Sequence, residues 1–198
     1  RGTPGVVLEV GVDRAVAQGL PLYLQAGTRG IGVISGLDAA IHVFMGYPGY
    51  KAIAHLPLDQ QAAAMRQPQR KAQILAEKSE RRSGEGSAVP PIVDILLARI
   101  EQIAWRMFPL KAGDRQPDYE PPLSASLGAQ ARARGCSALE VIYDHMAQGD
   151  GGNLIYFPIF NYNAGNLDVV AQMLQHPRAL YGLSDAGARS CPVPPCES

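Results

Sequence analysis

The sequence has few cysteines, no excess of charge of either sign and no long hydrophobic run. Its three cysteines, Cys136, Cys191 and Cys196, are too sparse for a disulfide-stapled secreted domain. Lys and Arg number 18, and Asp and Glu also number 18, which argues against a nucleic-acid-binding or polybasic membrane surface. No apolar run reaches the roughly 18 residues that a membrane-spanning helix needs. We therefore expect no nucleic-acid partner and no membrane partner.

The first residues, RGTPGVVLEV, contain no initiator Met and no signal-peptide pattern. We expect the natural N-terminus to lie upstream and take a cytoplasmic location as the default. The chain of 198 residues is 46% hydrophobic and 18% charged, which is typical of a folded domain with a sizeable core. Cys191 and Cys196 lie among prolines without the second cysteine pair of a zinc knuckle, so residues 190–198 are interpreted as an irregular tail.

Hydrophobic periodicity predicts helices and strands in alternation. The helices are expected at 5–19, 58–67, 68–78, 92–108, 127–135, 137–148 and 165–175, and the strands at 20–26, 153–160 and 179–184. The second half of 92–108 is equally compatible with a strand. Residues 31–56 are expected to be loop with short helical pieces, and 79–91 a flexible polar insertion. This order favours an α/β fold with a parallel sheet.

Two helix starts carry capping patterns. Ser137 and Glu140 have the spacing of a capping box, in which the two side chains reciprocally satisfy free amides of the first turn. Asn163 is expected to cap the helix that follows it.

Histidine and glycine patterns exclude several kinds of site. The four histidines, His42, His55, His145 and His176, show no H-x-H or H-x-x-x-H spacing, so spacing alone predicts no zinc site. We interpret His145 and His176 as structural or solvated. GLSDAG is not a G-x-S-x-G nucleophile elbow, and GVISGLDAA lacks the context of a nucleotide-binding loop.

Asp185 remains as a candidate functional residue. It follows the last predicted strand, where the catalytic groups of a parallel α/β barrel are found. An aspartate after a strand also commonly forms a turn or caps a helix. Both interpretations stay open from the local sequence.

The segment HPRALYGLSDAGA (176–188) resembles the last-strand motif of the amidohydrolase superfamily, in its D-aminoacylase or N-acyl-D-amino-acid deacylase branch. Residues 19–44, 48–77, 106–122 and 134–174 are similar to further stretches of that branch, in the same order. The resemblance covers about Gly5 to Ala188.

The resemblance implies a (β/α) barrel hydrolase, with a small accompanying β-domain, that cleaves a non-peptide C–N amide bond of an N-acyl-D-amino acid or related small amide. It implies a zinc cofactor whose bound water attacks the scissile carbonyl. Asp185 matches the aspartate that contacts this water, so the resemblance gives it both a metal-site and a catalytic role, as general base and then acid.

The chain also departs from the family pattern. Arg189 stands where the family has His, the family's H-x-H pair is absent, and a complete barrel takes roughly 250 residues. We therefore expect residues 1–189 to be the C-terminal portion of a barrel, a partial TIM-like fold with a loop-rich helical insertion at about 30–125. The strands at 20–26 and 179–184 are expected to flank the gap in this barrel. The alternative is a catalytically inactive α/β remnant that serves as a folded or partner-binding module.

Overall fold

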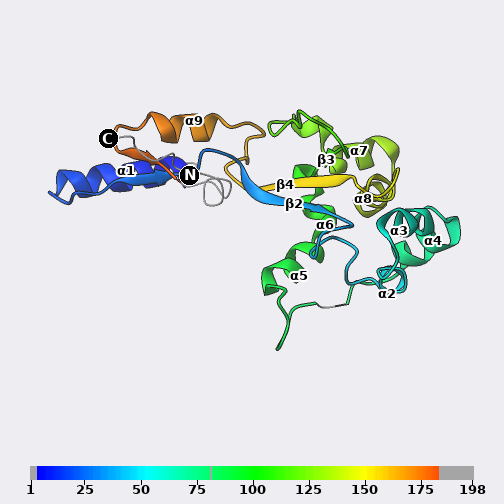
Figure 1. The fold of residues 1–198 in the computed structure, drawn as a ribbon. Helices are drawn as coiled ribbons and strands as arrows, with labels where there is room; N and C mark the ends of the chain where they lie inside the picture. Colours follow the sequence, from blue (N-terminus) through cyan, green and yellow to red (C-terminus); the bar gives the residue numbers. More distant parts are fainter. Residues whose placement is uncertain (1–3, 81, 183–198) are drawn as a thin grey trace, which may run out of the picture. The chain divides into compact units, whose positions relative to one another are not determined.

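The fold is known from a computed structural model that describes residues 4–80 and 82–182 (Figure 1). These residues form a mixed α/β structure with one sheet of two strands and one of three. The predicted α/β class is therefore confirmed, while neither sheet of the described residues closes into a barrel. The chain divides into two compact units, residues 1–31 with 160–198 and residues 32–159, which are described separately below.

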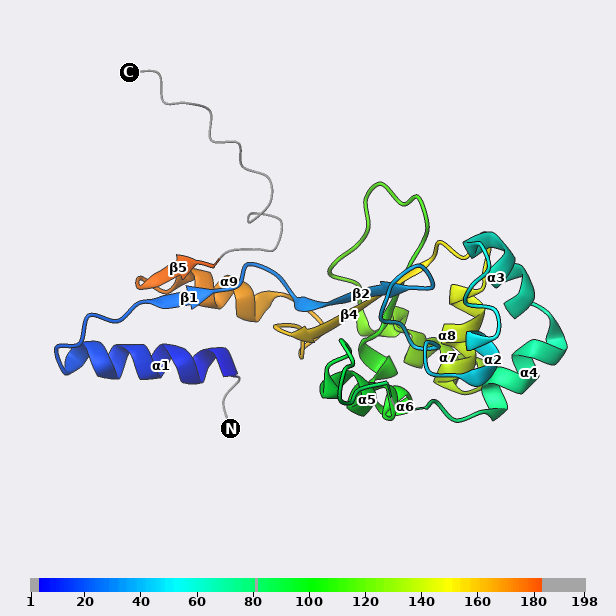
Figure 2. The same cartoon turned by 60° about the horizontal axis from the view of Figure 1, so that its bottom comes forward.

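The first unit contains a parallel strand pair. Its elements are α1 (Pro4–Ala17), β1 (Leu24–Ala26), α9 (Asp168–Gln175) and β5 (Ala179–Tyr181). Leu24 pairs with Ala179 and Ala26 with Tyr181, so the two strands run in the same direction. Helix α9 packs against both strands (Figure 2). A buried cluster of Ala26, Val170 and Met173 joins the helix to the sheet.

This pairing corrects one expectation. The segments 20–26 and 179–184 were predicted to lie on opposite sides of a gap, but β1 and β5 are hydrogen-bonded neighbours. The strand periodicity located both segments correctly, yet it carries no information about which strands pair. Parallel partners need a connection that crosses over, and here that connection contains the whole of residues 32–159 and α9.

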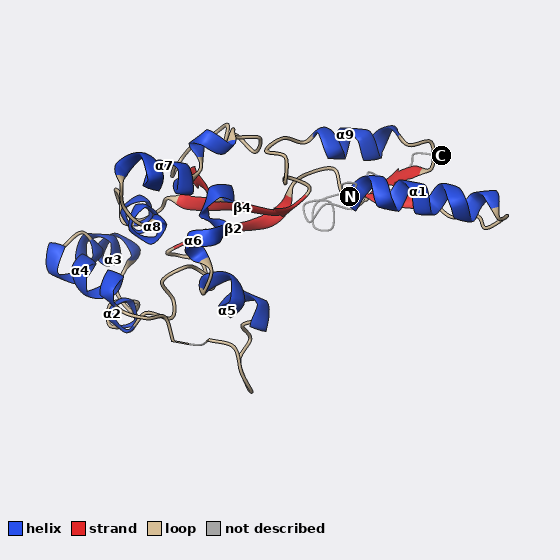
Figure 3. Ribbon diagram, turned by 180° about the vertical axis from the view of Figure 1, so that it is seen from behind, coloured by secondary structure: helices blue, strands red, loops and turns tan. Residues whose placement is uncertain are grey.

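The second unit is built around a three-stranded sheet of order β2-β4-β3. The strands are β2 (Ile31–Gly36), β3 (Phe108–Leu110) and β4 (Leu154–Phe160) (Figure 3). Strand β4 was predicted, and β3 is the short strand at the end of the ambiguous 92–108 segment. Strand β2 was predicted as loop because its two glycines obscure the alternation. Gly32 is required there, since a Cβ would lie 2.6 Å from the Cα of Pro158 and clash with the carbonyl of Phe157.

Short helices make up the rest of this unit. They are α2 (Pro48–Lys51), α3 (Leu58–Met65), α4 (Pro68–Ala76), α5 (Pro91–Leu97), α6 (Ile100–Ile103), η1 (Ala104–Arg106), η2 (Leu123–Ala125), α7 (Leu127–Arg134) and α8 (Ala138–Met146). Helix α4 begins at Pro68 as predicted, because proline suits a first helical position. Helix α7 ends at Gly135, whose φ of 66° is the left-handed conformation that glycine adopts without strain. The predicted helix 92–108 is instead divided into α5, α6 and η1.

Helix α8 lies at the centre of the core. It buries Val141, Ile142, Tyr143 and Met146. These side chains join a cluster that reaches every helical segment from α2 to α7 except the 3₁₀ turn η2. Burying an aliphatic side chain of this size stabilises a fold by about 1.5–3 kcal/mol. The tyrosine hydroxyl is satisfied, since it donates to the carbonyl of Met65 at 2.8 Å.

The start of α8 confirms half of the predicted capping box. Ser137 Oγ accepts a hydrogen bond from the Glu140 amide at 3.1 Å. The carboxylate of Glu140 does not return the bond but contacts Lys71 at 3.0 Å. Glu101, from α6, accepts instead from the amides of Ala138 and Leu139. The predicted cap of α9 is wrong as well, since Asn163 makes no cap and Leu167 precedes the helix.

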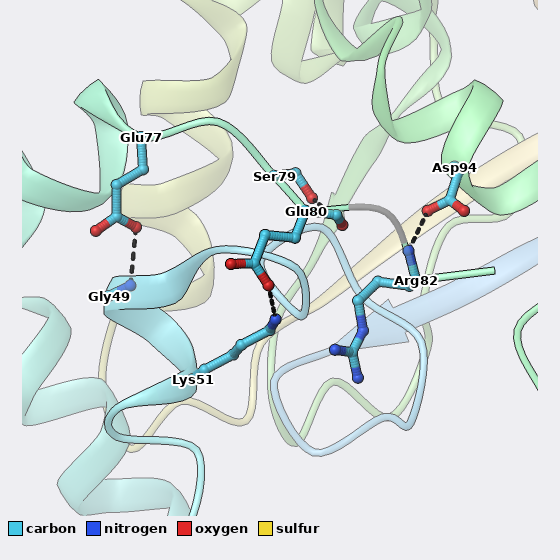
Figure 4. A network of polar contacts seen from close by, with 7 residues as sticks. All are labelled: Gly49, Lys51, Glu77, Ser79, Glu80, Arg82 and Asp94. Atoms are coloured by element: carbon cyan, nitrogen blue, oxygen red, sulfur yellow. Dashed lines mark hydrogen bonds and ion pairs between the residues drawn. The ribbon is translucent and has the colours of Figure 1, made fainter. Parts of the chain in front are cut away.

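Polar contacts hold the connection between α4 and α5, which was predicted as a flexible insertion (Figure 4). Glu77 accepts a hydrogen bond from the Gly49 amide at 2.8 Å, and Glu80 pairs with Lys51. At the other end, Asp94 accepts from the Arg82 amide at 2.9 Å and from the Ser83 amide at 2.7 Å. Both ends of this polar segment are therefore tied to helices.

Within residues 4–80 and 82–182, no helix has the length and apolar character needed to cross a membrane. This agrees with the absence of a long apolar run in the sequence.

The close packing of α7 on η1 predicts opposite effects for two glycine substitutions. A Cβ on Gly128 would lie 2.7 Å from the Trp105 nitrogen and 2.8 Å from the Ala104 carbonyl carbon, whereas nothing lies within 4 Å of one on Gly11. Gly128→Ala should lower the free energy of unfolding by about 1–3 kcal/mol through overpacking. Gly11→Ala, also in a helix, should not lower it, because alanine favours helix by about 1 kcal/mol over glycine. Denaturant unfolding of both variants measures the two effects, and a Gly128→Ala protein as stable as the parent would contradict the packing.

Candidate functional site

The predicted catalytic residue, Asp185, lies outside the described residues, as do Ser184, Cys191 and Cys196. The structure does describe the strand that leads to it. Because β1 and β5 are parallel, their carboxyl ends share one edge of the sheet. The Gly182 amide extends this pairing by donating to the carbonyl of Ala26 at 2.7 Å.

The loop that follows β1 at the same edge is held by Asn161. Its side-chain amide donates to the Arg29 carbonyl at 3.2 Å. Asn161 has a φ of 63°, a conformation that asparagine tolerates better than most residues. Hydrogen bonds thus hold the carboxyl edge of the β1–β5 pair at Gly182 on one strand and at Arg29 in the loop that follows the other strand.

The implied zinc cofactor does not fit the described residues. No group of three or more His, Cys, Asp or Glu side chains that could hold a metal ion occurs among them. His176 donates to Asp13 at 3.2 Å, and the ring of His145 contacts the Leu154 carbonyl at 2.8 Å. These contacts support the interpretation of both residues as structural, and Cys136 is a free, half-buried thiol.

A pocket of about 630 Å³ lies across one face of α8 in the unit 32–159. Val141, Asp144, His145 and Gln148 form its floor, since residues at i, i+3, i+4 and i+7 share one face of a helix. Residues from α3, the start of α4, α7 and the end of β3 also line it. The volume is within the roughly 300–1,000 Å³ of small-molecule sites.

This α8 pocket is lined by four basic side chains, those of Arg66, Lys71, Lys111 and Arg134. Lys71 contacts Asp144 at 2.7 Å and Glu140 at 3.0 Å. Burial lowers the pKa of Lys71, but its hydrogen bonds to these two carboxylates outweigh burial and raise the pKa overall. Arg66 Nη1 donates to the carbonyls of Ala147 at 2.7 Å and Gly149 at 2.6 Å.

Two titratable side chains that line the pocket, His145 and Tyr143, add no charge near pH 7. Burial lowers the pKa of His145, although hydrogen bonds to the Leu154 and Leu110 carbonyls partly offset this effect. Burial also raises the pKa of Tyr143. The positive charge of the pocket therefore comes from lysine and arginine alone.

A second, apolar pocket of about 90 Å³ lies between β2 and α5 and is lined by His42. His42 is 5% exposed, and its Nδ1 accepts a hydrogen bond from the Phe44 amide at 3.2 Å. The ring meets that of Tyr50 edge-on at 4.7 Å. Burial lowers the pKa of His42 to about 4, so this histidine is neutral at physiological pH.

No protein-family model matches the sequence, and no curated protein or solved structure matches it either. The functional argument therefore depends on the residues themselves.

Sequence reasoning missed both pockets. The basic residues of the α8 pocket come from elements distant along the chain, and no motif links them. The weak signal that existed was the helical segment 137–148, in which Asp144, His145 and Gln148 place polar groups beside the apolar Val141 on one face of the helix.

The burial of His42 predicts a specific pH dependence of stability. Its folded pKa of about 4 is below the 6.5 of a solvent-exposed histidine, so the unfolded chain binds the proton more tightly. The stability that neutral His42 contributes is full above pH 6.5 and is lost as the pH falls toward about 4, by roughly 3 kcal/mol in total. In His42→Asn, the side-chain oxygen can still accept a hydrogen bond from the Phe44 amide. The free energy of unfolding of this variant should not show this decrease between pH 6.5 and pH 4.

Urea unfolding at steps between pH 7 and pH 4 measures the effect as the difference between parent and variant, because the carboxylates titrate in both. The matched control is His55→Asn, since His55 is exposed, and it should keep the parent slope. Parallel curves for the parent and His42→Asn would show that the unfolded chain does not hold this proton more tightly.

Proposed function

We propose that the chain is part of a metal-dependent amidohydrolase of the D-aminoacylase branch, acting on N-acyl-D-amino acids or related small amides. The observation that carries the proposal is the parallel β1–β5 pair with α9 packed against both strands. A strand, a helix and a parallel strand form the repeating unit of a (β/α) barrel. The ordered resemblance over about Gly5 to Ala188 supplies the reaction class.

The inserted unit is compatible with this arrangement. Residues 32–159 leave and rejoin the first unit between β1 and α9. Gly32 and Pro158, near the two ends of the insert, lie against each other, so the insert can be accommodated in one connection of a barrel. The remaining barrel strands would come from residues outside those described.

The proposed role of Asp185 is proton transfer. In amide hydrolysis, the oxygen of water bonds to the carbonyl carbon, the C–N bond breaks, and the amine leaves with a proton. Asp185 would accept the proton of the attacking water and deliver it to the amine nitrogen, as general base and then general acid. Its position after a barrel strand is where such groups are found.

Among the described residues, no group of three or more His, Cys, Asp or Glu side chains could hold zinc. If the enzyme uses zinc, its ligands must lie elsewhere in the polypeptide. Determining the coding sequence on both sides of residues 1–198 tests this directly. An H-x-H pair upstream and a histidine following the Asp185 motif in place of Arg189 are expected, and the absence of both rejects the proposal.

The alternative function, a catalytically inactive binding module, is favoured by one specific observation. The unit 32–159 has its own core and a pocket of small-molecule size, neither of which requires Asp185. Under this alternative, hydrolysis of N-acyl-D-amino acids would be absent from the full polypeptide whatever metal is added.

The proton-transfer role predicts a rate effect in the full polypeptide. Asp185→Asn preserves side-chain size but cannot accept the proton, so kcat should fall by about 10²–10⁴-fold while KM changes little. Ser184→Ala, at the preceding position, should cost far less. Steady-state hydrolysis of N-acetyl-D-amino acids, followed by release of the free amine, measures both variants. If Asp185→Asn kept nearly full turnover, the catalytic role would be rejected and Asp185 would be a turn or capping residue.

A further inference from the structure

We propose that the α8 pocket binds a small organic anion that carries carboxylate or phosphate groups. This binding would depend on the charges of the side chains that line the pocket and does not require the amidohydrolase function. Arg66, Lys111 and Arg134 line the pocket together with one face of α8.

Within residues 4–80 and 82–182, the three cations differ from Lys71 because no acidic side chain forms an ion pair with them. Lys71 is paired with Asp144 and Glu140, so the only carboxylate lining the pocket, that of Asp144, is already engaged by a lysine. Among the described residues, none places a carboxylate at ion-pair distance from Arg66, Lys111 or Arg134. Gathering like charges without a counter-ion is unfavourable, and an anionic ligand would relieve this repulsion.

The cations are also attached to ordered backbone. One nitrogen of Arg66 is fixed to two carbonyls at the end of α8, which leaves its other guanidinium nitrogens as donors. The backbone beside Lys111 is held by the Ala112 amide, which donates to Asn153 Oδ1 at 2.9 Å. Arg134 belongs to the last turn of α7, where a cation is compatible with the helix dipole. Donors that are already positioned lose less freedom on binding.

The size and charge of the site favour a small molecule over a nucleic acid. The pocket of about 630 Å³ is concave, whereas a nucleic-acid surface is a basic stripe on a basic domain. The whole chain has a formal net charge of +0. Guanidinium and ammonium groups bind carboxylate and phosphate oxygens through charge-assisted hydrogen bonds, so these two groups share the required chemistry.

The test measures binding of two probes to the 198-residue chain by isothermal titration calorimetry at low salt. Citrate represents carboxylates and inorganic pyrophosphate represents phosphates, and the tighter of the two identifies the preferred group. We expect saturable binding to one site by at least one probe, weakened by added NaCl. Lys111→Gln and Arg134→Gln should each weaken it about tenfold or more, as expected for the loss of a charged hydrogen bond.

The matched control is Arg132→Gln, which removes the same charge from the same helix at an exposed position outside the pocket lining. It should leave the affinity within about twofold, since the long-range effect of one exposed charge is small. Circular dichroism melts check that the variants remain folded, which is expected because Lys111 and Arg134 are exposed.

Three results would overturn the proposal. The first is the absence of saturable binding by both probes. The second is an equal loss of affinity in Arg132→Gln, which would indicate a diffuse charge effect. The third is tighter binding of a single-stranded oligonucleotide that depends on Lys111 and Arg134, which would make the pocket part of a nucleic-acid surface.

Discussion

The burial of α8 is the interaction on which the unit of residues 32–159 depends. Its apolar face packs in the core, and its polar side chains form hydrogen bonds or ion pairs with the neighbouring elements. Tyr143 holds the end of α3, Glu140 and Asp144 hold α4 through Lys71, and His145 contacts the first residue of β4. The face of α8 that carries Asp144 and His145 also lines the pocket.

Features that depend on residues close together in the sequence were predicted, whereas features that depend on distant residues were not. Helices α7 and α8 were predicted well, since periodicity, Ser137 and Gly135 all act within a few residues. The contribution of Glu101 to the start of α8 was not predictable, because the cap comes from α6, far back along the chain. Strand β2 was missed for a similar reason. The need for glycine at position 32 is explained only by the nearby backbone of Phe157 and Pro158, which are distant along the chain.

The same distinction applies to the sites. Asp185 was selected because it stands beside a strand within a recognisable stretch of sequence, so its local context carries the signal. Arg66 follows α3, Lys111 follows β3 and Arg134 ends α7, so they line one pocket only in the folded chain. His42 likewise reads as an ordinary loop histidine, and its lowered pKa results from tertiary burial. Charge convergence and desolvation are properties of the packed chain, which spacing in one sequence does not encode.

The insertion of one unit into the other has a consequence for how the two proposed functions are related. The entropic cost of closing a flexible loop rises slowly with the length of the loop. A folded insert whose two ends lie side by side avoids much of this cost. Gly32 and Pro158 lie against each other, on strands that are neighbours in one sheet. The parallel pairing of β1 and β5 therefore does not depend on which residues form the core and the pocket of the insert. The α8 pocket can consequently vary in the ligand it binds without altering the β1–β5 edge that leads to Asp185, and each site can change independently of the other.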